Sequence, residues 1–158
     1  MDDVTAPPNS LYERDFHEWA LEQARLLRER RFAALDLENL VEEVESVGRS
    51  SKSEIENRLE LLLAHLLKWK CQPGARSTGW TGTIFEQRGR ILGIVRDSPS
   101  LKHYPGRVMH DCFRAARLLA AKETGIDFTL FPETCPFTIE QVLDEEFWPK
   151  EPDLYDQS

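Results

Sequence analysis

The sequence predicts an all-α protein, a single helical bundle of about five helices with a short C-terminal capping helix. Apolar residues recur every three or four positions along most of the 158-residue chain, which is the spacing of helices with one buried face. Clusters of Gly, Pro and Ser divide these periodic stretches into segments of helical length. No stretch alternates apolar and polar residues between hairpin turns, as a half-buried strand would. Long helices joined by short connections are typical of an up-and-down bundle.

The first predicted helix covers about residues 11–30. Ser10 is suited to cap its N-terminus, because a serine side chain accepts a hydrogen bond from the first free N–H groups of a helix. The apolar positions that follow have helical spacing: Leu11, Phe16, Trp19, Leu26 and Leu27. We expect residues 1–10 to form a disordered leader, which lacks the basic and apolar regions of a secretory signal.

Asp36 is placed to cap a second helix, in the stretch DLENLVEEVESVG. Helical spacing puts five apolar residues on one face and three glutamates on another: Leu37, Leu40, Val41, Val44 and Val47 against Glu38, Glu42 and Glu45. The helix is therefore expected to bury its apolar face and to expose its acidic face.

Two interpretations stay open after Gly48. Ser51 and Glu54 form a capping box, which would start a new helix at this point. Alternatively, the helix continues, because one apolar or small stripe passes unbroken through this region: Val44, Gly48, Ser51, Ile55, Leu59, Leu62, Leu66 and Trp69. We favour the continuous helix, which Pro73 and Gly74 then stop.

Three further segments complete the predicted domain. A helix covers about residues 80–97, and another begins near Pro105 and ends at Gly125. An extended loop then leads to a capping box of Thr138 and Gln141, which opens a short helix through Leu143. The predicted organisation is one helical domain over residues 11–149, followed by an acidic disordered tail over residues 150–158.

Composition and charge narrow the classes of function. With 41% hydrophobic and 30% charged residues the chain is globular, and no apolar run is long enough to cross a membrane. The net charge of −8 disfavours a nucleic-acid partner, although residues 76–107 are locally basic. Three widely spaced cysteines, Cys71, Cys112 and Cys135, suit a reducing compartment, and none has zinc-ligand spacing. We expect a soluble, cytoplasmic protein that needs no cofactor.

Arg88 lies on the apolar stripe of the helix over residues 80–97, between Ile84 and Ile91. Burying an unpaired charge costs several kcal/mol, so a buried Arg88 is expected to need a carboxylate partner. The acidic face of the second helix could supply it. We therefore predict a structural polar cluster of Arg88 with Glu42 and Glu45.

The same acidic face is also a candidate metal site. Helical bundles bind metal ions through carboxylates and histidines that project inward from facing helices, and Glu38, Glu42 and Glu45 alone would suit magnesium. Helical nucleotide pyrophosphatases use such carboxylates, but on two helices, whereas this sequence has one acidic helix. A solvated acidic face is the competing interpretation.

Arg58 and His65 are the candidate catalytic pair. They lie seven residues apart and so on one face of a helix. Their spacing resembles the Arg-x(4–6)-His signature of the HEPN helical-bundle ribonucleases, in which arginine and histidine act on an RNA phosphate. An arginine can hold a phosphate and a histidine can move a proton. The competing interpretation is that His65, within the leucine-rich RLELLLAHLLKWK, is a packed core side chain.

Several blocks of the sequence resemble a known family. They are LYERDFHEWALEQARLLRERRF, LDLENLVEEVESVGRS, LLAHLLKW, EQRGRI, DSPSL and FPETCPFTIEQVLDEEFWP, which together run from Leu11 to Pro149. In this order they resemble the bacterial domain-of-unknown-function family numbered twenty-nine. The resemblance implies a soluble, all-helical bacterial protein and implies no reaction, so no catalytic residue is carried over. The glycine-rich STGWTGT is a departure from the family pattern.

These observations favour a non-enzymatic interaction or regulatory module with a protein partner, and the amphipathic first helix would suit a homodimer. The alternative is an enzyme: a HEPN-like ribonuclease using Arg58 and His65, or a metal-dependent nucleotide hydrolase using the acidic helix. The state of His65 discriminates between them. An interaction module should bury it with both ring nitrogens bonded, whereas an enzyme should present it with Arg58 in an open cleft.

Overall fold

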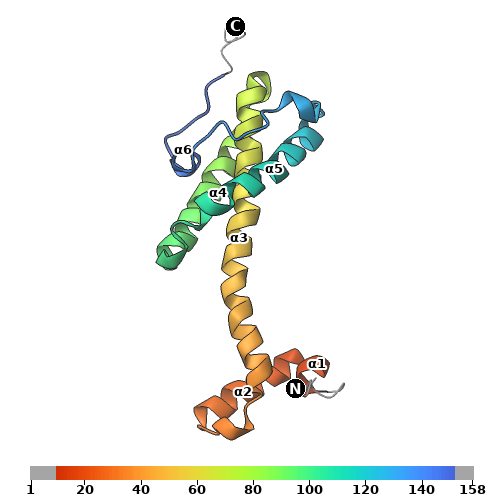
Figure 1. Ribbon diagram of the computed structural model, residues 1–158, viewed down its shortest axis with the longest axis vertical. Helices are drawn as coiled ribbons and strands as arrows, with labels where there is room; N and C mark the ends of the chain where they lie inside the picture. Colours follow the sequence, from red (N-terminus) through yellow and green to blue (C-terminus); the bar gives the residue numbers. More distant parts are fainter. Residues whose placement is uncertain (1–9, 152–158) are drawn as a thin grey trace. The chain divides into compact units, whose positions relative to one another are not determined.

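A computed structural model of the chain describes residues 10–151, and it confirms the all-α class. Within this range the chain forms six α-helices and four short 3-10 helices, and no strand (Figure 1). The predicted leader and acidic tail lie almost wholly outside the described residues. The described residues divide at Arg49 into two compact units. Each unit is described by itself below, and the single domain over residues 11–149 stays a prediction.

The first unit contains α1 (Leu11–Arg14), α2 (Phe16–Arg28) and the beginning of α3 (Leu37–Cys71). Ser10 caps α1 as predicted, but the predicted helix over residues 11–30 is broken at Asp15. The Asp15 carboxylate accepts a hydrogen bond from the Glu18 N–H at 2.9 Å and so starts α2 as a separate helix. An aspartate satisfies the free N–H groups of a helix start better than it continues a helix, which explains the break.

Asp36 connects α2 to the start of α3. Its carboxylate accepts hydrogen bonds from the Trp19 indole at 3.0 Å and from the Asn39 N–H at 3.4 Å, the second as the predicted cap. Its own N–H donates to the Gln23 side chain at 2.8 Å. Trp19 and Leu26 are the two buried hydrophobic residues of this unit among those described.

Helix α3 runs without interruption from Leu37 to Cys71, so the continuous helix favoured above is confirmed and the capping box at Ser51 is not used. Gly48 and Ser51 lie inside the helix. The helix ends at Cys71, and Pro73–Ala75 then form a short 3-10 helix.

The second unit packs α4 (Thr78–Asp97), α5 (Tyr104–Thr124) and the short α6 (Ile139–Leu143) with the C-terminal half of α3 (Figure 1). Ser77 caps α4. Gly125, in the left-handed conformation at φ 72°, ends α5. The predicted capping box of Thr138 and Gln141 opens α6. The core of this unit is leucine-rich on α3 and is completed from the other helices and the C-terminal loop: Leu59, Leu62, Leu63, Leu66, Leu67, Ile84, Ile91, Phe113, Ala116, Phe131 and Val142, among others.

Candidate functional site

His65 lies in the core of the second unit with both ring nitrogens engaged. Its side chain is 8% exposed. Nδ1 lies 2.9 Å from the Leu61 carbonyl oxygen. A carbonyl oxygen can only accept, so Nδ1 carries the proton and Nε2 is left as an acceptor. Nε2 accepts a hydrogen bond from the Lys68 ammonium group at 3.4 Å.

Burial, with the neighbouring Lys68, favours this neutral form of His65. The ammonium nitrogen of Lys68 is buried, donates to the Glu123 carboxylate at 2.5 Å and lies 5.0 Å from the centre of the Trp80 ring. Burial lowers the pKa of His65, the Leu61 carbonyl opposes this, and the positive charge of Lys68 adds to the lowering. The ring therefore has no free nitrogen with which to take up a substrate proton.

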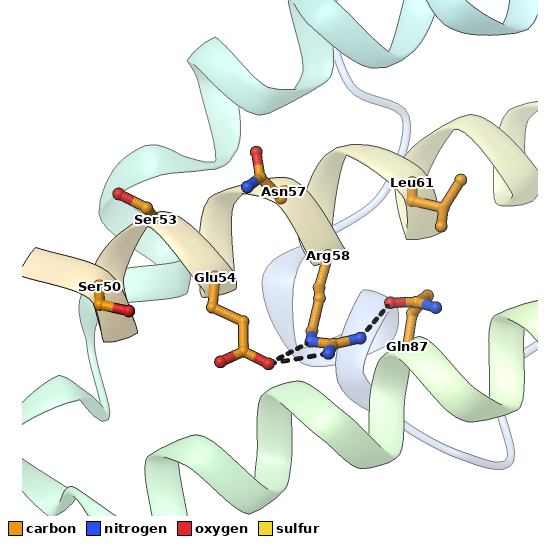
Figure 2. Close-up of a pocket in the computed structure, with 7 residues that line it drawn as sticks. All are labelled: Ser50, Ser53, Glu54, Asn57, Arg58, Leu61 and Gln87. Atoms are coloured by element: carbon orange, nitrogen blue, oxygen red, sulfur yellow. Dashed lines mark hydrogen bonds and ion pairs between the residues drawn. The ribbon is translucent and has the colours of Figure 1, made fainter. Parts of the chain in front are cut away.

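Arg58 lies elsewhere, in a pocket of about 510 Å³ on α3 and α4. Figure 2 shows its guanidinium between two protein acceptors. Nε and Nη2 approach one Glu54 carboxylate oxygen at 2.8 Å, and Nη1 donates to the Gln87 side chain at 3.1 Å. The other lining residues are Ser50, Ser53, Asn57 and Leu61.

The structure does not bring the predicted catalytic pair together. The pocket is lined by Arg58 but not by His65, which instead contacts Lys68. An arginine that clamps a phosphate needs its paired N–H groups free to face the ligand. Those of Arg58 face Glu54. Because His65 does not line the same pocket, the two side chains do not converge on one point where a phosphate could bind.

The three candidate metal ligands lie on the exposed surface of the first unit. The Glu42 carboxylate pairs with Arg49 at 2.6 Å, and the Glu45 carboxylate approaches the same guanidinium at 3.7 Å. Glu38 is exposed. Over residues 10–151 no group of three or more His, Cys, Asp or Glu side chains is placed to hold a metal ion.

Arg88 is fully buried and is bonded to backbone carbonyl groups of the second unit. Its guanidinium donates to the carbonyl oxygens of Val142 and Phe147, each at 2.8 Å, and to that of Gln141 at 3.5 Å. It also lies 5.7 Å from the Trp148 ring. Carbonyl dipoles of the α6 region thus receive the charge. Glu42 and Glu45 belong to the first unit, and the predicted cluster with them stays a prediction.

Burial lowers the pKa of the Arg88 guanidinium, and the charges of Asp144 and Glu145 oppose that shift. Both carboxylates follow α6 directly. The carbonyl groups and carboxylates of this short C-terminal segment thus offset the loss of solvation of the Arg88 guanidinium. Arg88 ties this segment to α4.

The three cysteines are free thiols whose burial disfavours the thiolate form. Burial raises the pKa of Cys112 to about 12, with nearby carboxylates adding to the shift, and it also raises the pKa of Cys71 and of Cys135. A thiol is reactive only as the thiolate, so a raised pKa opposes reactivity.

Exposed apolar side chains are concentrated in the first unit. Eight of the thirteen large exposed hydrophobic residues lie in residues 10–49: Phe16, Leu21, Leu27, Phe32, Leu37, Val41, Val44 and Val47. We call the last four of these the α3 stripe. The sequence placed them on one apolar face but predicted that face to be buried.

These features define an all-α protein in which parts of three long helices and a short C-terminal helix share one core. None of its helices within residues 10–151 combines the length and the apolar character that crossing a membrane requires. The chain belongs to the family described as "Domain of unknown function DUF29", whose model matches residues 11–148. No curated protein and no solved structure matches the chain.

Proposed function

We propose that the protein is an interaction module and that the α3 stripe is its docking surface. One observation carries the proposal. The apolar positions of α3 are completely buried at Ile55, Leu59 and Leu62, but Leu37, Val44 and Val47 are 61–72% exposed. Exposed apolar surface costs about 25 cal/mol per Å², so a contiguous apolar face is expected to have an occupant.

The size of the first unit supports this proposal. Units of about 40 residues rarely bury enough surface to be stable without a disulfide, a metal ion or a partner. Residues 10–49 contain no cysteine and bury two hydrophobic side chains. A partner that covers the apolar face would supply the missing core.

The two candidate catalytic residues give the enzyme alternative no such support. Arg58 is occupied by Glu54 and Gln87. His65 is neutral, buried and bonded at both nitrogens. This is the arrangement expected of structural side chains.

Site-specific photo-crosslinking in cells tests the proposal. A benzophenone amino acid at Val44 is expected to form a crosslink to a protein, because this position faces the occupant. The matched control carries the same group at Leu118, an exposed residue of α5 in the second unit (61% against 71% for Val44). Equal crosslinking at the two positions, or none at Val44, would contradict a docking role for the stripe.

A further inference from the structure

We infer that the occupant of the α3 stripe is a second copy of this chain, in a reciprocal dimer. This inference rests on the proposed function and names the partner of the same surface. In the inferred dimer the α3 stripe of each copy contacts the exposed outer side of α2 of the other copy. The first unit carries both complementary surfaces, as the following features show.

The α3 stripe is bordered by negative charge. Residues 36–47 contain five acidic side chains and no basic one. Glu38 and Glu45 lie on the helix next to the stripe and are exposed. A surface that covers the stripe should therefore be apolar with positively charged side chains at its edge.

The outer side of α2 and the turn after it have this chemistry. We call this surface the α2 patch. Its apolar members are Leu21, on the side of α2 opposite the buried Trp19 and Gln23, and Phe32, in the turn after the helix; each is 59% exposed. Residues 25–31 contain four arginines and one glutamate. Arg25 and Arg31 pair with Glu22 and Glu29, so the positive charge offered to a partner is that of the exposed Arg28 and Arg30. Arg30, Arg31 and Phe32 border a surface hollow of about 540 Å³ that could receive an apolar side chain.

The backbone conformation of Arg30 is a further reason to assign its side chain to the α2 patch. It is the one residue other than glycine with a left-handed backbone among those described, at φ 59°. The Arg31 N–H bonds to the Leu26 carbonyl and the Arg30 N–H to the Leu27 carbonyl, a Schellman motif in which glycine usually takes the place of Arg30. A strained arginine where glycine would be relaxed indicates that its side chain is used.

Both surfaces remain open within one copy. Hydrogen bonds from Trp19 and to Gln23 join α2 to Asp36 through its inner side, so the α2 patch is turned away from that contact. The α3 stripe is likewise exposed. A twofold axis would place the patch of each copy on the stripe of the other, which uses both surfaces and closes the assembly at two chains.

Sedimentation of the full chain, with two charge-reversal variants, tests this inference. The wild type is expected to have about twice the chain mass of 18.3 kDa. One variant combines Arg28→Glu with Arg30→Glu, and the other combines Glu38→Lys with Glu45→Lys. Each variant alone places like charges across both contacts, and its dissociation constant should rise at least about tenfold.

Mixing the two variants is the decisive step. In the mixture every contact again joins opposite charges, so a one-to-one heterodimer is expected to form. Val44→Asp should also dissociate the wild-type dimer, whereas the control Leu118→Asp should not. Circular dichroism checks that each variant keeps its helix content, so that a loss of association is not a loss of folding.

Three results would overturn the inference. The wild type could be monomeric up to about 100 µM, a concentration above most specific dissociation constants. The variant at Arg28 and Arg30 could remain dimeric, which would point to a different contact. The mixture could fail to form a heterodimer. If the wild type is monomeric and Val44 still crosslinks to another protein, the self-association fails and the proposed function stands. If Val44 captures no protein, both fail.

Discussion

The two halves of α3 carry the same kind of apolar stripe, but the stripe is covered in one half only. From Ile55 onward its residues are buried by α4, α5 and the C-terminal loop. From Leu37 to Val47 comparable residues are exposed. The difference shows that helical periodicity identifies the apolar face of a helix and leaves open what covers it.

The largest difference is expected between truncations of an apolar side chain in the buried half and in the exposed half of α3. Leu66→Ala removes a completely buried side chain and should lower the free energy of unfolding of the second unit by about 2–5 kcal/mol. Val44→Ala, at a position that is exposed within one copy, should change the free energy of unfolding of the second unit by less than about 0.5 kcal/mol. Urea unfolding measures both. Equal losses would mean that the two halves do not differ in burial.

The second comparison is between two arginines of α4, the buried Arg88 and the exposed Arg90. Arg88→Met leaves the carbonyl groups of Val142 and Phe147 without their donor and should cost about 1–3 kcal/mol. Hydrogen exchange should accelerate over residues 139–148. The control Arg90→Met, on the exposed side of α4, should leave exchange there unchanged. Unchanged exchange in Arg88→Met would show that the carbonyl contacts do not hold the segment.

A third prediction compares the buried His65 with His17, which is exposed in the first unit. The pKa of His65 in the folded protein lies below its ordinary value of 6.5. The unfolded chain therefore binds a proton first as the pH falls, and the stability of the second unit should decrease below about pH 6.5. His65→Gln should flatten this dependence, while His17→Gln should keep it. A stability that rises on acidification through this range would be inconsistent with a neutral, buried His65.

The smallest effect concerns the two left-handed helix ends, Arg30 after α2 and Gly125 after α5. Arg30→Gly removes strain and should stabilise the end of α2 by up to about 1 kcal/mol. Gly125→Ala introduces the same kind of strain and should cost about 1 kcal/mol. Amide exchange of the flanking residues reports each local effect. Changes of the same sign at the two positions would contradict the assigned conformations.

Local chemistry made much of the fold predictable. Asp36 and the capping box of Thr138 and Gln141 each start the helix that they predict, and Gly125 ends one. Ser10 also caps a helix, but that helix is the four-residue α1 and not the predicted helix over residues 11–30. These signals act within four residues of the chain, so they can be identified without knowing the packing. The break at Asp15 was missed, although the cap that causes it, from the Glu18 N–H to the Asp15 carboxylate, is also a local signal.

The candidate site was less predictable, because its chemistry depends on neighbours that are distant in the sequence. Arg58 and His65 share a helix face, yet they have different partners. Arg58 donates a hydrogen bond to Gln87. His65 contacts Lys68, whose ammonium group donates to Glu123. A buried Arg88 was predicted to need a carboxylate partner. Its partners are carbonyls of residues 141–147, more than fifty positions along the chain, which no spacing rule indicates.

The sequence by itself determined that the chain is helical, where most helices begin and end, and which face of α3 is apolar. These properties follow from hydrogen bonds and side-chain spacing within a few turns of one helix. Only the tertiary structure decided that one half of that face is buried and the other exposed, and that His65 is neutral while Arg88 is bound by carbonyls. Burial depends on which surfaces meet, and a pattern along one helix does not contain that information.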